Sequence, residues 1–218
     1  MNRIKQVAAG LLLASSGLAA STASAEVSYN IGYASEYYFR GILQKSSSAS
    51  AGADFTQGGL YAGIWTADVG DGLEVDVYGG YGIETDSGFS ASIGATGYYY
   101  TGQFDDKYEE INLNFGYGMF GLEYSFGKAG FSSNESDYDF LAVTVTGENG
   151  LYGKAATFGQ DADGDYLEFG YGTTVSDIDL GVSYIISSKE LGVLNGEVNS
   201  LGEGQQSEAL IFTIGKTF

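Results

Sequence analysis

The sequence contains no cysteine, no histidine and no proline. Without cysteine the chain can form neither disulfides nor thiolate metal sites. Without histidine it has no Ser-His-Asp triad, no histidine-paired aspartate and no histidine metal site. The absence of proline is compatible with long uninterrupted strands. We therefore predict that the protein is not an enzyme and uses no cofactor or metal.

Basic residues are scarce: 9 Lys and Arg stand against 28 Asp and Glu. All 28 acidic residues follow Ala25, but only 7 of the basic ones do, so the formal charge beyond this position is −21 (7 − 28). Such a chain repels phosphate backbones, which excludes nucleic acid as a partner. It also repels anionic lipid surfaces unless the charge is confined to loops and an interior.

The first 25 residues have the features of an export signal. A positively charged start precedes an apolar run over residues 7–20, and Ala23-Ser24-Ala25 offers small residues where a signal peptidase cleaves. We predict a cleaved signal peptide over residues 1–25 and one domain over residues 26–218. No later window holds the ~18 consecutive apolar residues of a membrane-spanning helix. The exported domain is then either soluble or a barrel that crosses the membrane with strands.

Beyond the predicted signal, apolar and polar residues alternate with period 2, and no stretch has a convincing helical pattern. Leu73, Val75 and Val77, for example, alternate with Glu74 and Asp76. A soluble β-sandwich would show the same alternation, so periodicity does not decide between the two classes. The pattern predicts about twelve strands, with ten as the alternative. They lie near residues 27–40, 47–56, 59–67, 73–84, 88–100, 108–117, 119–127, 138–146, 150–158, 165–173, 178–188 and 207–217.

Short and long connections alternate along the chain. The short ones fall at residues 57–58, 85–87, 118, 147–149 and 176–177. The longer ones fall at residues 41–46, 67–72, 101–107, 128–137, 160–164 and 189–206. This alternation is typical of a membrane barrel with turns on one side and loops on the other. We therefore predict an all-β fold, a closed antiparallel up-and-down transmembrane β-barrel.

The last of these loops contains Asn195-Gly196, a strong hairpin signal. We expect the last two strands to extend there as a ribbon beyond the membrane. The alternative is a loop that folds inward and constricts the pore.

The final strand pattern runs to an aromatic last residue, Phe218. Such an end is typical of the strand that barrel-assembly machinery reads in outer-membrane proteins. We expect this machinery, outer-membrane lipid and lipopolysaccharide as partners, and the bacterial outer membrane as the location. Lys216 falls on the outward phase, where its long stem can reach the interface.

The polar phase of the strands predicts the pore lining. Arg40 falls on the inward phase of the first strand, and Glu36 lies four residues earlier on the same face, which predicts a lumenal ion pair. An excess of carboxylates raises the local concentration of cations and disfavours anions. The candidate lining residues are Glu36, Arg40, Glu74, Asp76, Glu84, Glu110, Asn112, Asn114, Glu123, Glu168 and Asp179.

Other patterns have plainer interpretations than the activities they suggest. Residues 116–121 match the dinucleotide pattern G-x-G-x-x-G, but a strand follows, so a tight turn is favoured. The acidic stretch 161–165 lacks the glycine spacing of a calcium loop, which favours a surface loop over weak divalent-cation binding. The acid face of the strand at residues 73–84 has the groups of a glycosidase, but a polar lining is favoured. In the aromatic clusters 37–39 and 98–100, the outward members predict an interfacial girdle, and inward ones such as Tyr38 predict wall packing rather than a sugar-stacking ladder.

Three segments carry a resemblance to a known family: residues 30–42 (NIGYASEYYFRGI), 59–65 (GLYAGIW) and 73–81 (LEVDVYGGY). Together they resemble the TorF family of porins, over the whole chain beyond the predicted signal and most specifically in the first two hairpins. The resemblance implies an outer-membrane porin-like barrel. It implies little about the solute and supplies no catalytic residues.

These observations favour a channel for passive diffusion of small solutes or ions, cation-leaning or neutral. One alternative is a non-conducting outer-membrane surface or adhesin barrel that acts through its acidic loops. Another is a soluble secreted β-sandwich.

Overall fold

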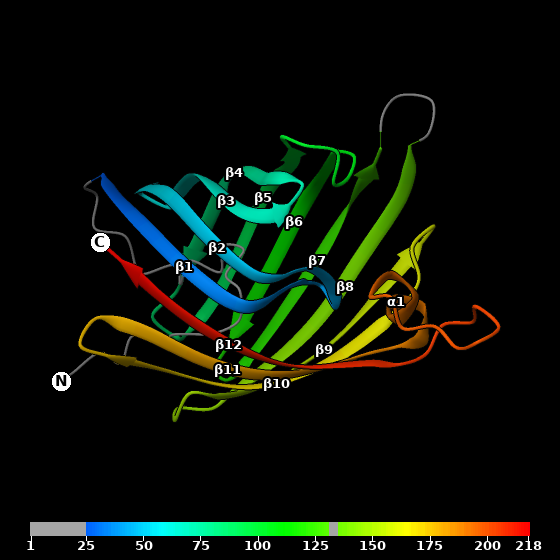
Figure 1. Cartoon of the computed structure of the whole chain (residues 1–218). Coiled ribbons are helices and arrows are strands. Elements are labelled where there is room, and N and C mark those ends of the chain that lie inside the picture. Colours follow the sequence, from blue (N-terminus) through cyan, green and yellow to red (C-terminus); the bar gives the residue numbers. More distant parts are fainter. Residues whose placement is uncertain (1–24, 131–134) are drawn as a thin grey trace.

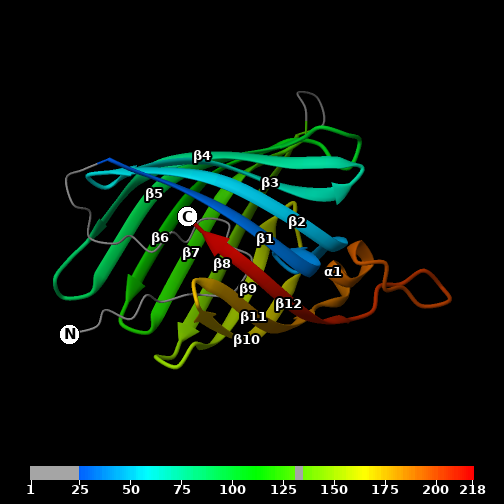
Figure 2. The same ribbon diagram turned by 60° about the vertical axis from the view of Figure 1, so that its left-hand side comes forward.

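The computed structural model describes residues 25–130 and 135–218, so the predicted signal peptide lies outside the described residues apart from Ala25. The described chain is a closed antiparallel barrel in which each of twelve strands pairs with its sequence neighbours and β12 pairs with β1 (Figures 1 and 2). The predicted fold class and the count of twelve are confirmed. The strands are β1 (Glu26–Phe39), β2 (Ile42–Gln57), β3 (Leu60–Gly70), β4 (Gly72–Glu84), β5 (Phe89–Tyr100), β6 (Tyr108–Tyr117), β7 (Phe120–Ala129), β8 (Ser136–Thr146), β9 (Leu151–Gln160), β10 (Asp165–Val175), β11 (Ile178–Ser187) and β12 (Ser207–Thr217).

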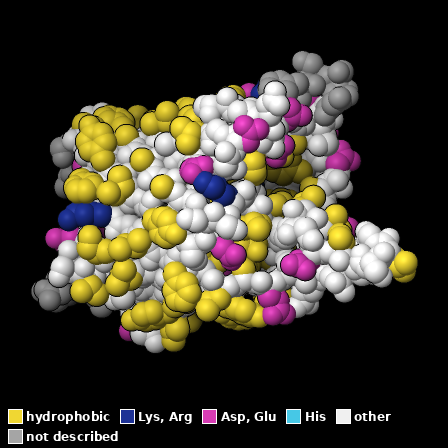
Figure 3. Space-filling view, viewed as in Figure 1, with side chains coloured by type: hydrophobic (Ala, Val, Ile, Leu, Met, Phe, Trp, Pro, Cys, Tyr) yellow, Lys and Arg dark blue, Asp and Glu magenta, His cyan; other side chains and the backbone are white. Residues whose placement is uncertain are grey.

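The strands alternate between an apolar outer face and a polar, small-residue or aromatic inner face. Large hydrophobic side chains are exposed on the outside of every strand, from Val27 on β1 to Ile214 on β12, while Glu74, Asp76 and Glu110 are buried inside. Figure 3 shows hydrophobic side chains spread over one side of the barrel, with acidic side chains mostly toward one end. This inverted arrangement is the one that a strand barrel needs in lipid.

The two ends of the barrel differ. The turn end holds the connections at residues 58–59, 85–88, 118–119, 147–150 and 176–177, and Tyr29 and Phe218 exchange two backbone hydrogen bonds there. The loop end holds the remaining connections together with the helix α1 (Lys189–Leu194) (Figure 1). The glycine pattern at residues 116–121 forms the tight turn between β6 and β7, as predicted.

Two loops predicted at residues 41–46 and 67–72 are wrong. The ladder between β1 and β2 continues through the pair Phe39↔Ile42, and that between β3 and β4 continues through Gly70↔Gly72. Each connection is therefore a tight turn. Backbone hydrogen bonds to a neighbouring strand outweigh the turn propensity of the single residues in these two segments.

The ribbon predicted at Asn195-Gly196 is also wrong. Residues 189–194 form α1, Asn195 is its C-cap, and Gly196 has a φ of +83°. The same dipeptide that favours a hairpin turn also ends helices, because its glycine adopts the left-handed conformation freely. Leu191 of α1 is 1% exposed and packs inside the barrel, as the inward-folding alternative requires. Among the described residues, no helix has the length and apolar character needed to cross a membrane.

The outward face can be tested at Ile93, which is 56% exposed in the middle of β5. In protein refolded into phospholipid vesicles, Ile93→Lys should lower the free energy of unfolding by about 2–4 kcal/mol, because it places a charge in the hydrocarbon layer. Denaturant titration followed by the fluorescence of Trp65, the single tryptophan, measures the loss. The inward neighbour Ser92→Lys is the control and should lose far less. Equal losses would mean that this face does not contact lipid.

Candidate functional site

The β1–β2 tip, residues 36–44, leaves the barrel wall and enters the lumen. β1 pairs with β12 only as far as Ala34↔Thr213, whereas its ladder with β2 continues to Phe39↔Ile42 after a register shift at Tyr37. Arg40 and Gly41 then form a two-residue turn with φ values of +48° and +84°. Two consecutive positive φ values are typical of tight hairpin turns. The tip is thus a hairpin held together by its own ladder, and it pairs with neither β12 nor β3, since the ladder between β2 and β3 begins only at Ser50↔Ala67.

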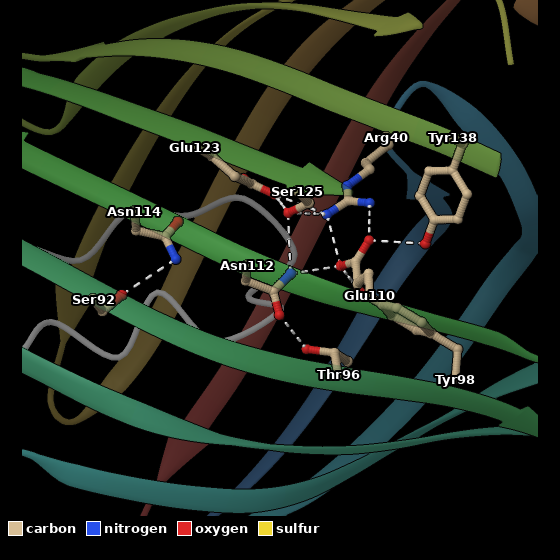
Figure 4. Close-up of polar contacts among 10 residues, drawn as sticks. All are labelled: Arg40, Ser92, Thr96, Tyr98, Glu110, Asn112, Asn114, Glu123, Ser125 and Tyr138. Carbon is tan, nitrogen blue, oxygen red and sulfur yellow. Dashed lines mark hydrogen bonds and ion pairs between the residues drawn. The ribbon is translucent and has the colours of Figure 1, made fainter. Parts of the chain in front are cut away.

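The Arg40 side chain crosses the lumen to the opposite wall. Its Nη1 donates to Glu110 Oε2 at 2.8 Å and its Nη2 to Glu110 Oε1 at 3.0 Å, which makes the ion pair bidentate (Figure 4). Nη2 also donates to Glu123 Oε1 at 2.9 Å and to Ser125 Oγ at 3.1 Å. Glu110 lies on β6 and Glu123 on β7, across the closed strand order from β1. One side chain therefore links the two sides of the barrel.

Two aromatic rings flank the Arg40 guanidinium. Its Cζ lies 4.2 Å from the ring centroid of Phe140 and 5.0 Å from that of Phe39. Cation–π contacts of this kind stabilise a guanidinium that is removed from water. The Arg40 side chain is only 8% exposed, so the rings replace much of its hydration.

Glu110 accepts more hydrogen bonds than the two from Arg40. Tyr98 Oη donates to it at 2.7 Å, Tyr138 Oη at 2.9 Å and Asn112 Nδ2 at 2.7 Å. The Glu110 side chain is 0% exposed. A buried ion pair is tolerated only when its remaining hydrogen-bonding capacity is satisfied, and here it is.

The last loop fastens the tip from the other side. Asn195 Oδ1 accepts from the Leu43 amide at 2.7 Å, and Asn195 Nδ2 donates to the Gly41 carbonyl at 3.0 Å. Ser187 Oγ donates to the same carbonyl at 2.7 Å. Asn195 also donates to Ser207 Oγ at 2.7 Å, which ties the contact to β12. Asn195 therefore replaces the backbone ladder that the tip lacks on its β12 side.

Two apolar clusters fill the space around the tip. One joins Phe140, Tyr166 and Ile185 to Leu191 of α1, and the other joins Tyr37 to Trp65 and its neighbours on β3. Buried side chains inside the barrel come from all twelve strands, Ser48 of β2 included. The loop half of the lumen is therefore a packed constriction.

The structure gathers only some of the predicted lining residues. Arg40, Glu110, Asn112 and Glu123 form one network, and Glu74 and Asp76 form a second buried group on β4. The others are dispersed: Asn114 bonds Ser92, Glu168 bonds Tyr152, Asp179 accepts from Thr174 at the turn end, and Glu84 is exposed at the end of β4.

The predicted ion pair between Arg40 and Glu36 is wrong. Arg40 lies in the turn, and its two partners are 70 and 83 residues away in sequence. The phase of β1 changes between the buried Ala34 and Tyr37, so this tyrosine lies in the lumen, where it is 1% exposed, although strict alternation placed it in the outer girdle. Tyr99 does point outward and is 42% exposed.

Sequence reasoning missed several residues of the interior. Lys154 faces the lumen, because it is the register partner of the buried Glu168. Asp54 accepts hydrogen bonds from Asn30 and Tyr78. The alternation within each strand could have identified both residues. Nothing in the sequence, however, indicates that Asn195 contacts the β1–β2 tip. Among the described residues, no group of three or more acidic side chains is arranged to hold a metal ion, the stretch 161–165 included.

The Arg40 network can be tested by removing its acid. Glu110→Ala leaves a buried guanidinium without its main partner and should lower the free energy of unfolding by about 3–5 kcal/mol. Glu109→Ala is the matched control: it faces outward in an exposed pair with Lys107 at 3.3 Å and should cost under about 1 kcal/mol. Arg40→Met/Glu110→Met should recover much of the loss, because neither charge remains. Similar values for the two single variants in denaturant titrations would contradict the network.

Solved structures similar to this chain include the outer membrane protein OpdK of Pseudomonas aeruginosa, at 11% identity and a TM-score of 0.41 over 80% of this chain and 57% of that one. OccAB2 of Acinetobacter baumannii has 12% identity and a TM-score of 0.42 over 87% and 59%. OprD of Pseudomonas aeruginosa has 11% identity and a TM-score of 0.39 over 89% and 66%. The chain thus spans less than two thirds of each of these structures. With TM-scores below 0.5, these likenesses decide neither the fold nor the function.

No curated protein matches the sequence. A protein family does: residues 18–218 match the one described as "Bacterial protein of unknown function (Gcw_chp)". This match spans nearly the whole chain, including all twelve strands. The chain belongs to the Gcw_chp family of bacterial proteins.

Proposed function

We propose that the protein is an outer-membrane channel for passive diffusion of small solutes or ions, narrowed at its loop half by the β1–β2 tip. The observation that carries this proposal is the Arg40 side chain, which spans a closed barrel from β1 to Glu110 and Glu123 on the far wall. A hairpin tip inside the barrel whose side chain reaches the opposite wall narrows the lumen at that level. A barrel interior with a purely structural role has no need of a cation carried in on a separate tip.

The membrane location rests on the outer face. Leu60, Ile93, Leu151 and Phe212 are each more than half exposed, and every strand presents at least one exposed large hydrophobic residue. A contiguous apolar belt of this extent is unfavourable in water but is what lipid requires. The proposal includes a cleaved signal peptide over residues 1–25, recognition of the Phe218 strand by barrel-assembly machinery, and contact of the loop end with lipopolysaccharide. The resemblance to TorF porins supports the same interpretation.

The lumen charge favours cations or neutral solutes. Glu123 is 34% exposed inside the barrel, and Asp54, Glu168 and the buried acids add to it. Against these stand Arg40, whose charge Glu110 already neutralises, and Lys154. Net negative charge around a narrow path attracts cations and repels anions.

A non-conducting surface barrel is the second candidate. The packing of the loop half of the lumen by two apolar clusters favours it. In that case the acidic connections at the loop end, such as residues 101–107, would be the active part. The two candidates differ in one measurable property, ion flow through folded protein.

Selectivity tests the first candidate. In a planar bilayer under a KCl gradient, the protein should give current steps whose reversal potential is shifted toward that of K⁺. Glu123→Gln should move this potential toward zero, because it removes a carboxylate that is open to the lumen. Glu109→Gln, which faces outward, is the control and should leave it unchanged. Folded, inserted protein that gives no current would overturn the channel and leave the surface barrel.

The tip as constriction is tested at Asn195. Asn195→Ala removes two hydrogen bonds to the tip, each worth about 1 kcal/mol. The ratio of docked to undocked tip should then fall roughly 30-fold, and the open probability in single-channel records should rise. Asn199→Ala is the control: Asn199 lies in the same loop, and its side chain bonds Leu201 and Glu203 rather than the tip. If the open probability of Asn195→Ala is unchanged while its conductance is intact, the tip is not the constriction. The channel itself would still stand.

A further inference from the structure

Glu74 and Asp76 lie two residues apart on β4, so both side chains point into the lumen from the same strand face. They are 1% and 0% exposed. Trp65 and Ala67, which form an apolar cluster with Tyr37, are their register partners on β3. Both carboxyl groups are thus held out of the path that solutes would use.

These two acids are not compensated in the way that Glu110 is. Glu74 Oε1 accepts one hydrogen bond, from Tyr37 Oη at 2.7 Å. Glu74 Oε2 and both side-chain oxygens of Asp76 are buried and have no hydrogen-bond partner. Arg40 is already engaged by Glu110 and Glu123. Three buried acceptor atoms therefore lie on one strand face without a donor to any of them.

Two ionised carboxylates in this position are physically unfavourable. Each would lose its hydration, and each would repel the other at short range. A proton between them removes one of the two charges and turns one free acceptor into a donor, as happens in carboxylate dyads that share a proton. We propose that Glu74 and Asp76 form a proton-binding site in which the pair holds one shared proton, and that this proton keeps the β1–β2 tip docked through Tyr37.

A proton fits this site better than a metal ion. Only two carboxyl groups converge, and hard divalent cations take six or more oxygen ligands. The described residues hold no group of three acidic side chains placed for a metal. The phenol of Tyr37 already donates to Glu74, so it offers a bond to a carboxylate rather than a ligand to a cation.

The groups whose charges act on the pair are phenols and other acids. Among the described residues they include Tyr37 from β1, Tyr78 from β4, Tyr98 and Tyr100 from β5, Asp105 from the β5–β6 loop, and Tyr108 and Glu110 from β6. The cation of the tip, Arg40, is paired with Glu110. The shared proton therefore leaves the pair with one negative charge in place of two.

The site makes docking depend on pH in a defined direction. In the unfolded chain both carboxyls lose their protons at about pH 4. The folded pair keeps one proton above that pH, so the folded state binds one more proton than the unfolded state. Stability from this site is therefore full at acidic pH and declines as pH rises, until the folded pair loses its proton. This is opposite to the behaviour of a carboxylate in an ion pair, such as Glu110.

Infrared spectroscopy at neutral pH tests the proton directly. The refolded protein should show the carbonyl stretch of a protonated carboxyl group, which ionised carboxylates lack. Asp76→Asn and Glu74→Gln should each abolish this band, because the new amide supplies the donor that the proton supplied. Glu123→Gln, a lumen acid outside the pair, should keep it. Two variants are used so that the test survives if one of them fails to fold.

Denaturant titration across neutral pH gives the second readout. Relative to Asp76→Asn, the folding equilibrium constant of the unmodified protein should fall up to tenfold per pH unit, the effect of one linked proton. Absence of both the band and this pH difference would overturn the proposal. Absence of the band together with stabilisation by NaCl or CaCl₂, but not by choline chloride, would assign a metal cation instead. None of these readouts uses conductance, so the proton site and the channel succeed or fail separately.

Discussion

The pairing of β1 with β12 is the constraint on which the rest of the molecule depends. A sheet that closes on itself has no free edge, and in lipid this is the only way for strands to satisfy all their backbone hydrogen bonds. The closing ladder is short, running from Asn30↔Thr217 to Ala34↔Thr213. Because β1 is released from β12 beyond Ala34, its last residues are free to turn inward. The closure that completes the wall thus also produces the tip that occupies the lumen.

The residues around the tip are those that a buried charge requires. Arg40 brings a cation into a space with little water. The opposite wall supplies a bidentate carboxylate, a second acid and the ring of Phe140, and Phe39 of the tip supplies a second ring. Glu74 and Asp76 occupy the same level of the barrel without a cation. The interior therefore holds two acidic groups with opposite dependence on protons: the first is stabilised by ionisation of Glu110, and the second is stabilised by retention of a proton.

Periodicity was sufficient to predict the wall, because a residue's phase in a strand depends on its immediate neighbours. The alternation in β4 and the position of β12 are examples, and all twelve strands follow from it. Contacts inside the lumen depend instead on register between distant strands and on backbone conformations that single residues do not announce. Arg40, for example, was predicted to lie in a strand and to pair with Glu36. Its positive φ places it in a turn instead, where its partner is Glu110. Asn195-Gly196 is ambiguous in the same way, because one dipeptide serves both a hairpin turn and a helix end.

The contacts that dock the tip differ in kind from those that hold the wall. Along β12 the wall is bound by a continuous backbone ladder, which opens only if the barrel opens. The tip is bound there by side chains alone: Asn195, Ser187 and the apolar contact of Leu191. Each side-chain hydrogen bond contributes a net free energy of about 1 kcal/mol. A few of them make the docked tip stable, and undocking still costs less free energy than unfolding of the whole barrel. On the β3 side the tip has no ladder either, because the pairing of β2 with β3 begins at Ser50↔Ala67. The tip is therefore joined to the wall only through the continuation of β1 and β2, and loss of its side-chain contacts would leave every ladder of the closed barrel intact.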